Sequence, residues 1–100
     1  MEREIKYHPK ALAEAFRSAR YYNRRHPGLG AEFFEEVDSV INQLRADPLR
    51  QRPDADGVRS WRLKRFLFRI YYFVEPDRIR ILAVAHPKRR SGYWRQRIEN

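Results

Sequence analysis

Basic side chains on two strand-like segments, followed by a histidine and a tyrosine, are the residues of this chain that could carry out chemistry. Arg62 and Lys64 lie two positions apart in one segment, and Arg80 and His86 share a phase in a later one. Residues at even spacing along a strand face the same side of a sheet. If the two phases coincide, these side chains converge on one surface, where they could bind a phosphate and stabilise its charge while His86 moves a proton. Tyr93 could supply a further proton donor or stack on a base.

The same residues also have a simpler interpretation. One face of a small sheet is commonly solvated, and Arg and Lys are usual residues on such a face. His86, before Pro87 at the end of a strand, suits a structural role, and Tyr93 and Trp94 suit a hydrophobic plug that folds the C-terminal segment onto the core. The three strands expected in the C-terminal half contain no Asp or Glu, so they offer no carboxylate base.

Several other chemistries lack the residues they need. The chain has no cysteine, which excludes disulfides, thiolate catalysis and Cys-based zinc sites. Its three histidines, at positions 8, 26 and 86, are too scattered to predict a metal site, and no Gly-rich phosphate loop is present. We therefore expect neither a metal nor a cofactor.

The net charge of +9 is confined to one half of the sequence. Residues 58–100 contain twelve Lys and Arg against three acidic residues, whereas residues 1–57 contain ten of each. Such an imbalance predicts a surface that meets an anionic partner, either nucleic acid or an acidic protein. The second expected helix is acidic and would be repelled from a DNA groove, which argues against helix-turn-helix recognition.

The periodicity of the apolar residues predicts the elements that position these groups. Residues 4–7 alternate as a short strand. Residues 10–25 and 30–46 have the apolar stripes of two amphipathic helices, separated by Pro27 and Gly28. The first stripe consists of Leu12, Ala15, Phe16, Ala19 and Tyr22, and the second of Phe33, Val37, Val40, Ile41 and Leu44. After a polar loop at residues 48–57, the period changes to two, which predicts strands at 59–66, 68–74 and 78–85. The prediction is a single α+β domain, residues 1–100, of order β-α-α-β-β-β, in which a helical hairpin packs on a small, mainly antiparallel sheet. With no long apolar run and a charged N-terminus, we expect a cytoplasmic protein.

Three C-terminal segments carry a resemblance to a known superfamily. They are residues 62–72 (RLKRFLFRIYY), 79–86 (IRILAVAH) and 89–97 (RRSGYWRQR), and the two expected helices match in kind. Over essentially its whole length the chain resembles the RelE/ParE superfamily of toxins from bacterial type II toxin–antitoxin systems. The resemblance implies two helices against a curved antiparallel sheet, growth inhibition or plasmid stabilisation as the biological effect, and a hetero-oligomeric complex with a cognate antitoxin whose C-terminal segment is acidic.

The superfamily implies two alternative targets. A ParE-like toxin poisons DNA gyrase without chemistry of its own, and the target and antitoxin would then be bound by the C-terminal residues Arg89, Arg90, Tyr93, Trp94, Arg95 and Arg97. A RelE-like toxin is a metal-independent endoribonuclease that cuts mRNA on the ribosome, and its catalytic residues would be Arg62, Lys64, Arg80, His86 and Tyr93. The strand carboxylate of some ribonuclease members is missing here, and His86 with Trp94 looks closer to the ParE-like group. We therefore favour the ParE-like interpretation.

Overall fold

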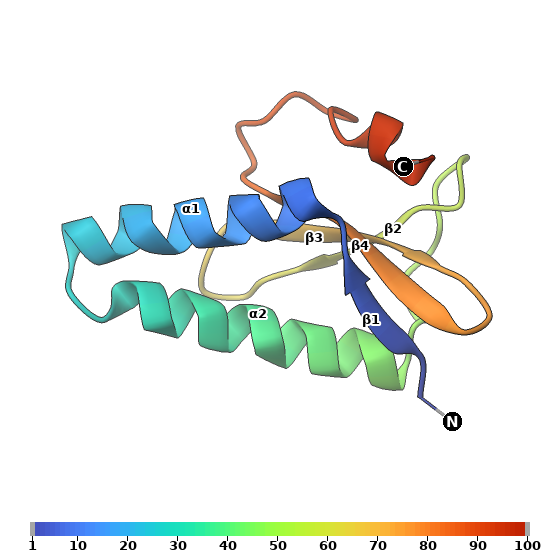
Figure 1. Cartoon of the computed structure of the whole chain (residues 1–100), viewed down its shortest axis with the longest axis horizontal. Helices are drawn as coiled ribbons and strands as arrows, with labels where there is room; N and C mark the ends of the chain where they lie inside the picture. The colour runs from blue at the N-terminus through green and yellow to red at the C-terminus, as the bar shows by residue number, and fades with distance from the viewer. Residues whose placement is uncertain (1, 100) are drawn as a thin grey trace.

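Two helices and four strands follow one another in the computed structural model, which describes residues 2–99 (Figure 1). The order is β1 (Glu4–Tyr7), α1 (Pro9–Arg25), α2 (Leu29–Ala46), β2 (Arg59–Arg62), β3 (Arg69–Val74) and β4 (Arg78–Ala85), and a short 3-10 helix, Arg95–Ile98, comes last. The sheet order is β1-β4-β3-β2, with β1 parallel to β4 and the other pairs antiparallel. The predicted α+β fold is therefore confirmed. Within residues 2–99, no helix is long and apolar enough to cross a membrane.

Helix α1 begins at a capping residue followed by proline, and it packs against the core mainly through small residues. The His8 side chain accepts a hydrogen bond from the Lys10 N–H at 3.0 Å, and Pro9 fills a first-turn position where a backbone N–H is not needed. The buried side of α1 carries mostly alanines and one acidic residue: Ala11, Glu14, Ala15 and Ala19. Leu12 and Phe16, which the predicted stripe included, are 41% and 49% exposed. The helix is thus rotated so that its smallest side chains allow the closest approach to the core.

The helical hairpin depends on a tight turn and on one close contact. Gly28 has a φ of 93°, a left-handed conformation that glycine adopts without steric strain. Gly30 lies so close to α1 that a Cβ atom there would be 2.5 Å from the Ala19 carbonyl oxygen. The predicted stripe of α2 is confirmed, because all of its members are buried: Phe33, Val37, Val40, Ile41 and Leu44.

The sheet separates two hydrophobic clusters. The larger one fills the space between the helices and the sheet and includes Ile70, Ile79 and Ile81. The smaller one, with Leu82 and Ala83, lies under the C-terminal segment, residues 86–99, which Figure 1 shows on the other side of the sheet from α2. β4 contributes to both clusters, as its continuous apolar sequence predicted.

An irregularity in β4 inverts its alternation. Tyr72 pairs with Ile81 and the adjacent Tyr71 pairs with Ala83, so Leu82 is an extra residue in the ladder, as in a β-bulge. Before it, the odd-numbered residues face the helices, and after it Val84 does so. Even-numbered residues before Leu82 therefore face away from the helices, whereas even-numbered residues after it face toward them.

The first long predicted strand, residues 59–66, is too long, because β2 ends at Arg62. The Glu36 carboxylate of α2 accepts hydrogen bonds from the backbone N–H groups of Lys64 at 2.6 Å, Arg65 at 3.0 Å and Phe66 at 3.3 Å. These donors point at one side chain instead of at a neighbouring strand, so residues 64–67 turn away from the sheet. The next predicted strand likewise begins at Arg69 instead of residue 68.

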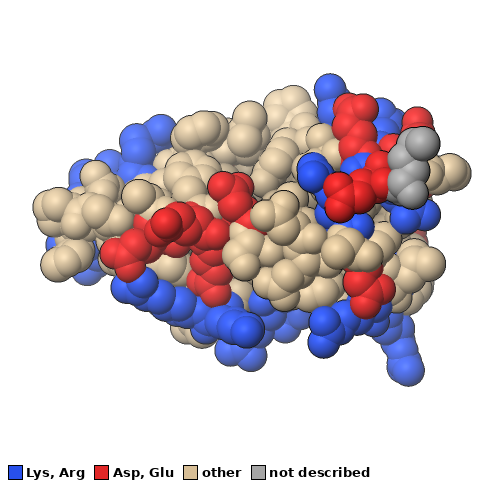
Figure 2. Space-filling view, turned by 90° about the horizontal axis from the view of Figure 1, so that it is seen from below, with Lys and Arg blue, Asp and Glu red and all other residues tan. Residues whose placement is uncertain are grey.

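Charge is distributed unevenly over the surface. Figure 2 looks onto the α2 side of the molecule, where acidic side chains gather in a band and Lys and Arg lie mostly along its edges. The acidic residues of α2 are Glu32, Glu35, Glu36 and Asp38. This side is therefore unsuited to binding a polyanion.

Candidate functional site

The C-terminal segment is anchored to the sheet by Trp94. This side chain is 3% exposed and packs against the Tyr71 ring, with centroids 4.6 Å apart. Leu82, Ala83 and Val58 complete the cluster around it. Trp94 therefore has the buried position that the plug interpretation predicts.

A second attachment uses the free edge of β4. β1 pairs with β4 only as far as Ile81, so the rest of that edge has no strand partner among residues 2–99. The Val84 N–H there donates to Glu14 Oε1 at 3.0 Å, and the Leu82 carbonyl accepts from Arg97 Nη1 at 2.9 Å. Two side chains thus satisfy backbone groups that would otherwise be buried without partners.

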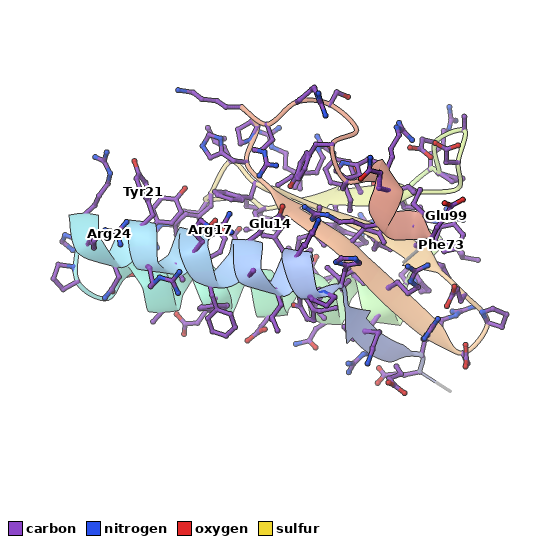
Figure 3. All side chains as sticks on the ribbon, turned by 45° about the horizontal axis from the view of Figure 1, so that its top comes forward. Glu14, Arg17, Tyr21, Arg24, Phe73 and Glu99 are labelled. Carbon is purple, nitrogen blue, oxygen red and sulfur yellow. The ribbon has the colours of Figure 1, made fainter. Side chains whose placement is uncertain are left out.

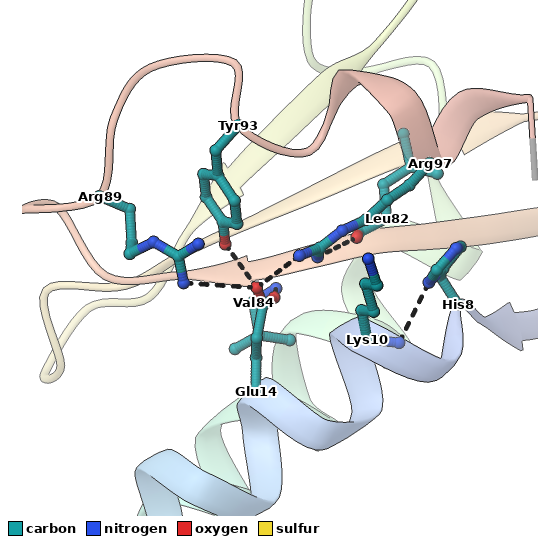
Figure 4. Close-up of polar contacts among 8 residues, drawn as sticks. All are labelled: His8, Lys10, Glu14, Leu82, Val84, Arg89, Tyr93 and Arg97. Atoms are coloured by element: carbon teal, nitrogen blue, oxygen red, sulfur yellow. Dashed lines mark hydrogen bonds and ion pairs between the residues drawn. The ribbon is translucent and has the colours of Figure 1, made fainter.

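Glu14 connects this edge to the C-terminal segment. It projects from α1 on the same side as Arg17, Tyr21 and Arg24 (Figure 3). Its Oε2 accepts hydrogen bonds from the Tyr93 hydroxyl at 2.8 Å and from Arg97 Nη2 at 2.9 Å (Figure 4). The Glu14 and Arg97 side chains are only 6% and 10% exposed, so this is a buried, hydrogen-bonded ion pair. We call Glu14, Val84, Tyr93 and Arg97 the Glu14 network.

The Glu14 network holds Tyr93 in its protonated form. Burial raises the pKa of the Tyr93 hydroxyl, and the hydrogen bond to Glu14 raises it further. The hydroxyl is thus committed as a donor to a buried carboxylate. Neither Glu14 nor its role was predicted from the sequence; the only signal was an acidic residue between Ala11 and Ala15, in the buried stripe of α1.

The predicted convergence of Arg62, Lys64, Arg80 and His86 on one surface is wrong, because the strands do not keep one phase. Arg80 lies before the bulge and donates to the backbone carbonyls of Ile98 at 2.6 Å and Arg97 at 2.8 Å. His86 lies after the bulge, where its ring meets Phe68 edge-on at 5.2 Å. Lys64 lies in the turn around Glu36. Whether any of these residues is catalytic stays a prediction.

Three of the predicted catalytic residues do meet at one pocket. This cavity of about 370 Å³, which we call the basic pocket, lies between the ends of β2, β3 and β4 and the C-terminal segment. Its polar lining consists mainly of Arg62, Arg69, His86, Arg89, Arg90 and Tyr93. No acidic residue lines it among residues 2–99. His86 Nδ1 accepts from the Lys88 N–H at 3.0 Å, so the neutral ring presents Nε2 as its donor.

The predicted target-binding residues divide into two groups. Arg89 and Arg90 line the basic pocket, and the Arg89 guanidinium lies 3.8 Å from the Tyr93 ring centroid. Arg95 instead pairs with Asp56, with Asp54 at 3.5 Å, and Arg97 is buried in the Glu14 network. The fold thus uses Arg95, Arg97 and Trp94 to hold the C-terminal segment, and leaves Arg89 and Arg90 on its outer surface.

Comparisons with known proteins agree with this fold. Residues 5–91 match the family described as the ParE toxin of the type II toxin–antitoxin system parDE. The chain therefore belongs to the ParE toxin family, and the predicted resemblance to the ParE-like group is confirmed.

A solved structure of the chromosomal ParDE toxin–antitoxin system from P. aeruginosa is similar to this chain, with a TM-score of 0.73 and 23% sequence identity. The similarity covers 84% of this chain and 95% of that one, and it supports the fold. None of the curated proteins compared matches the chain.

Proposed function

We propose that this chain inhibits bacterial growth by poisoning DNA gyrase and is neutralised by a cognate antitoxin. Membership of the ParE toxin family supports this function. The choice of gyrase as the target rests on the hydrogen bonds that Arg80 and Tyr93 form within the fold. Arg80 is bound to two backbone carbonyls, and the Tyr93 hydroxyl donates to buried Glu14. Side chains committed in this way hold the C-terminal segment in place, which favours a binding protein over a ribonuclease.

A ribosome-dependent endoribonuclease is the second candidate, and one observation favours it. Arg62, His86 and Tyr93 line the same pocket, so a phosphate there could be approached by a cation and a proton donor. The raised pKa of Tyr93 excludes it as a base near neutral pH, and His86 Nδ1 already accepts from the Lys88 N–H, so neither side chain is free to act as the base in this arrangement.

The antitoxin would meet a surface of mixed character. An acidic segment would be steered toward the chain by the net charge of +9. Exposed apolar side chains on α1 offer anchors for such a segment, since Leu12 is 41% exposed and Phe16, 49% exposed, packs edge-on against Phe34. Both gyrase and such an antitoxin are cytoplasmic, so the chain would act in the bacterial cytoplasm.

The gyrase proposal predicts a direct effect on the purified enzyme. Incubation of the chain with gyrase, ATP and relaxed plasmid should reduce supercoiling and leave cleaved plasmid after protein digestion. An equimolar amount of the antitoxin should restore supercoiling. Normal supercoiling by gyrase, together with ribosome-dependent cuts in mRNA mapped by primer extension, would instead establish the ribonuclease.

A double substitution separates the two candidates in cells. His86→Ala with Tyr93→Phe removes both candidate proton-transfer groups but retains the half-buried aromatic ring at position 93. Removal of a catalytic acid–base group typically lowers a rate by about 10²–10⁴. If the chain binds gyrase without acid–base chemistry, growth inhibition should instead stay within about threefold of wild type. Expression should be matched by immunoblot, and Arg52→Gln, at an exposed position, serves as the control. Loss of toxicity in the double variant, with folding intact by circular dichroism and with inhibition of purified gyrase unchanged, would contradict the gyrase proposal.

A further inference from the structure

The basic pocket contains more positive charge than the fold requires. Arg62 and Arg90 form no side-chain hydrogen bond or ion pair within residues 2–99. Arg69 donates only to the neutral Ser60 hydroxyl, at 3.1 Å. Like charges brought together without partners repel one another and destabilise a fold, so an anionic ligand is the simplest physical reason for such a cluster.

The wall of the basic pocket is held in place before any ligand arrives. The Tyr93 hydroxyl is fixed by Glu14, and the Arg89 guanidinium lies over the Tyr93 ring, 3.8 Å from Glu14 Oε2. Arg89 is thus oriented by two contacts, while its side chain stays 47% exposed. Orientation before binding reduces the entropy lost when a ligand is captured.

The size and charge of the pocket fit phosphate better than carboxylate. A volume of about 370 Å³ is at the small end of ligand pockets, large enough for part of a nucleotide. Guanidinium groups bind both phosphate and carboxylate in a bidentate manner, so the amount of charge distinguishes the two ligands. One phosphate monoester carries a charge of about −1.5 to −2 at neutral pH, whereas an acidic side chain carries one negative charge. A compact phosphate ligand therefore neutralises these arginines within the available volume, which a short acidic peptide does less completely.

A second hollow adjoins the basic pocket and could receive the rest of such a ligand. It has a volume of about 440 Å³ and shares Phe68, His86 and Arg89 with the basic pocket. Its α1 wall carries Arg17, Tyr21 and Arg24, which Figure 3 shows along one side of the helix together with Glu14, whose charge is paired with Arg97. Tyr21 is 45% exposed, with the Arg25 guanidinium 4.8 Å from its ring centroid, and the exposed part of the ring is a stacking surface for a base.

We propose that the basic pocket binds the terminal phosphate groups of a nucleotide, either free or at the 5′ end of a single nucleic-acid strand. Arg62, Arg89 and Arg90 hold the phosphates, and the base lies toward Tyr21. This inference goes beyond the proposed function and does not rest on it, because binding by the purified chain requires neither gyrase nor antitoxin.

Calorimetric titration of the full-length chain tests the proposal. The probes are ATP, a 5′-phosphorylated single-stranded hexanucleotide as DNA and as RNA, and a hexapeptide of Asp and Glu. The pocket variant is Arg62→Gln with Arg90→Gln. The matched control is Arg20→Gln with Arg52→Gln, which removes the same charge at exposed positions outside both hollows.

The expected result is that the pocket variant binds ATP or the oligonucleotide at least about tenfold more weakly, since each lost charge-assisted hydrogen bond lowers affinity by roughly that factor. The control should stay within about twofold of wild type. Tighter binding of ATP would identify a free nucleotide as the source of the phosphate, and tighter binding of the oligonucleotide would identify a strand. Three results would overturn the proposal: no binding of any phosphate probe, equal losses in both double variants, or equally tight binding of the acidic peptide through the same arginines.

Discussion

Replacement of Glu14 by alanine should destabilise the folded chain by about 3–5 kcal/mol, because it removes one partner of a buried ion pair and leaves the other charge uncompensated. Arg97 would keep only its bond to the Leu82 carbonyl, and the Val84 N–H at the free edge of β4 would lose its acceptor. The Tyr93 hydroxyl would also lose its partner. Urea unfolding followed by tryptophan fluorescence measures the free energy of unfolding.

Two further variants make this prediction specific. Glu35→Ala removes an exposed carboxylate of α2 and should change the free energy of unfolding by no more than about 0.5 kcal/mol. Glu14→Gln keeps an oxygen acceptor for Val84 but removes the charge that faces Arg97, so its stability should fall between those of wild type and Glu14→Ala. If Glu14→Ala is as stable as Glu35→Ala, the Glu14 network does not hold the C-terminal segment.

Replacement of Trp94 by alanine should have an effect of similar size, about 3–5 kcal/mol, through loss of packing. The side chain is 3% exposed and lies against Tyr71, so its removal leaves a cavity between the C-terminal segment and the sheet. Because the same segment carries Arg89 and Tyr93, the variant should also become sensitive to trypsin after residue 89 while α1 and α2 stay protected. Urea unfolding and timed proteolysis with mass spectrometry measure the two effects.

The control for this substitution is an exposed apolar residue. Leu49→Ala, at a side chain that is 59% exposed, should leave both stability and proteolysis close to wild type. Trp94→Phe should recover part of the lost stability, since a smaller aromatic ring can still pack on Tyr71. An unchanged free energy of unfolding in Trp94→Ala would mean that the segment is attached mainly by polar contacts.

Both predictions concern the attachment of the segment that forms one wall of the basic pocket. Glu14 attaches it through hydrogen bonds at the edge of β4, and Trp94 attaches it through apolar contact with the smaller cluster. A variant that releases the segment should therefore also lose anion binding. In contrast, Arg62→Gln with Arg90→Gln should weaken phosphate binding while the free energy of unfolding stays unchanged. This difference would distinguish the residues that bind the ligand from those that hold the C-terminal segment in place.

The sequence by itself determined the helices, the order of the elements and the family. Apolar stripes at helical spacing, His8 with Pro9 at the start of α1 and Gly28 at the hairpin turn are local signals, and each acts within a few residues of its own position. The concentration of positive charge in the second half was also evident, and so were the alternation of β3 and the apolar run of β4. These features needed no knowledge of which segments meet.

Only the tertiary structure decided which side chains share a site. The extra residue at Leu82 separates Arg80 from His86, and no composition or spacing in β4 signals it. Glu36 shortens β2 from 28 residues away, and Glu14 binds Tyr93 from 79 residues away. The physical reason is that a strand's phase and a buried carboxylate's partners depend on neighbours brought together by the whole fold. The sequence could therefore supply the cationic residues, but their division between the lining of the basic pocket and structural support was decided by the contacts of the folded chain.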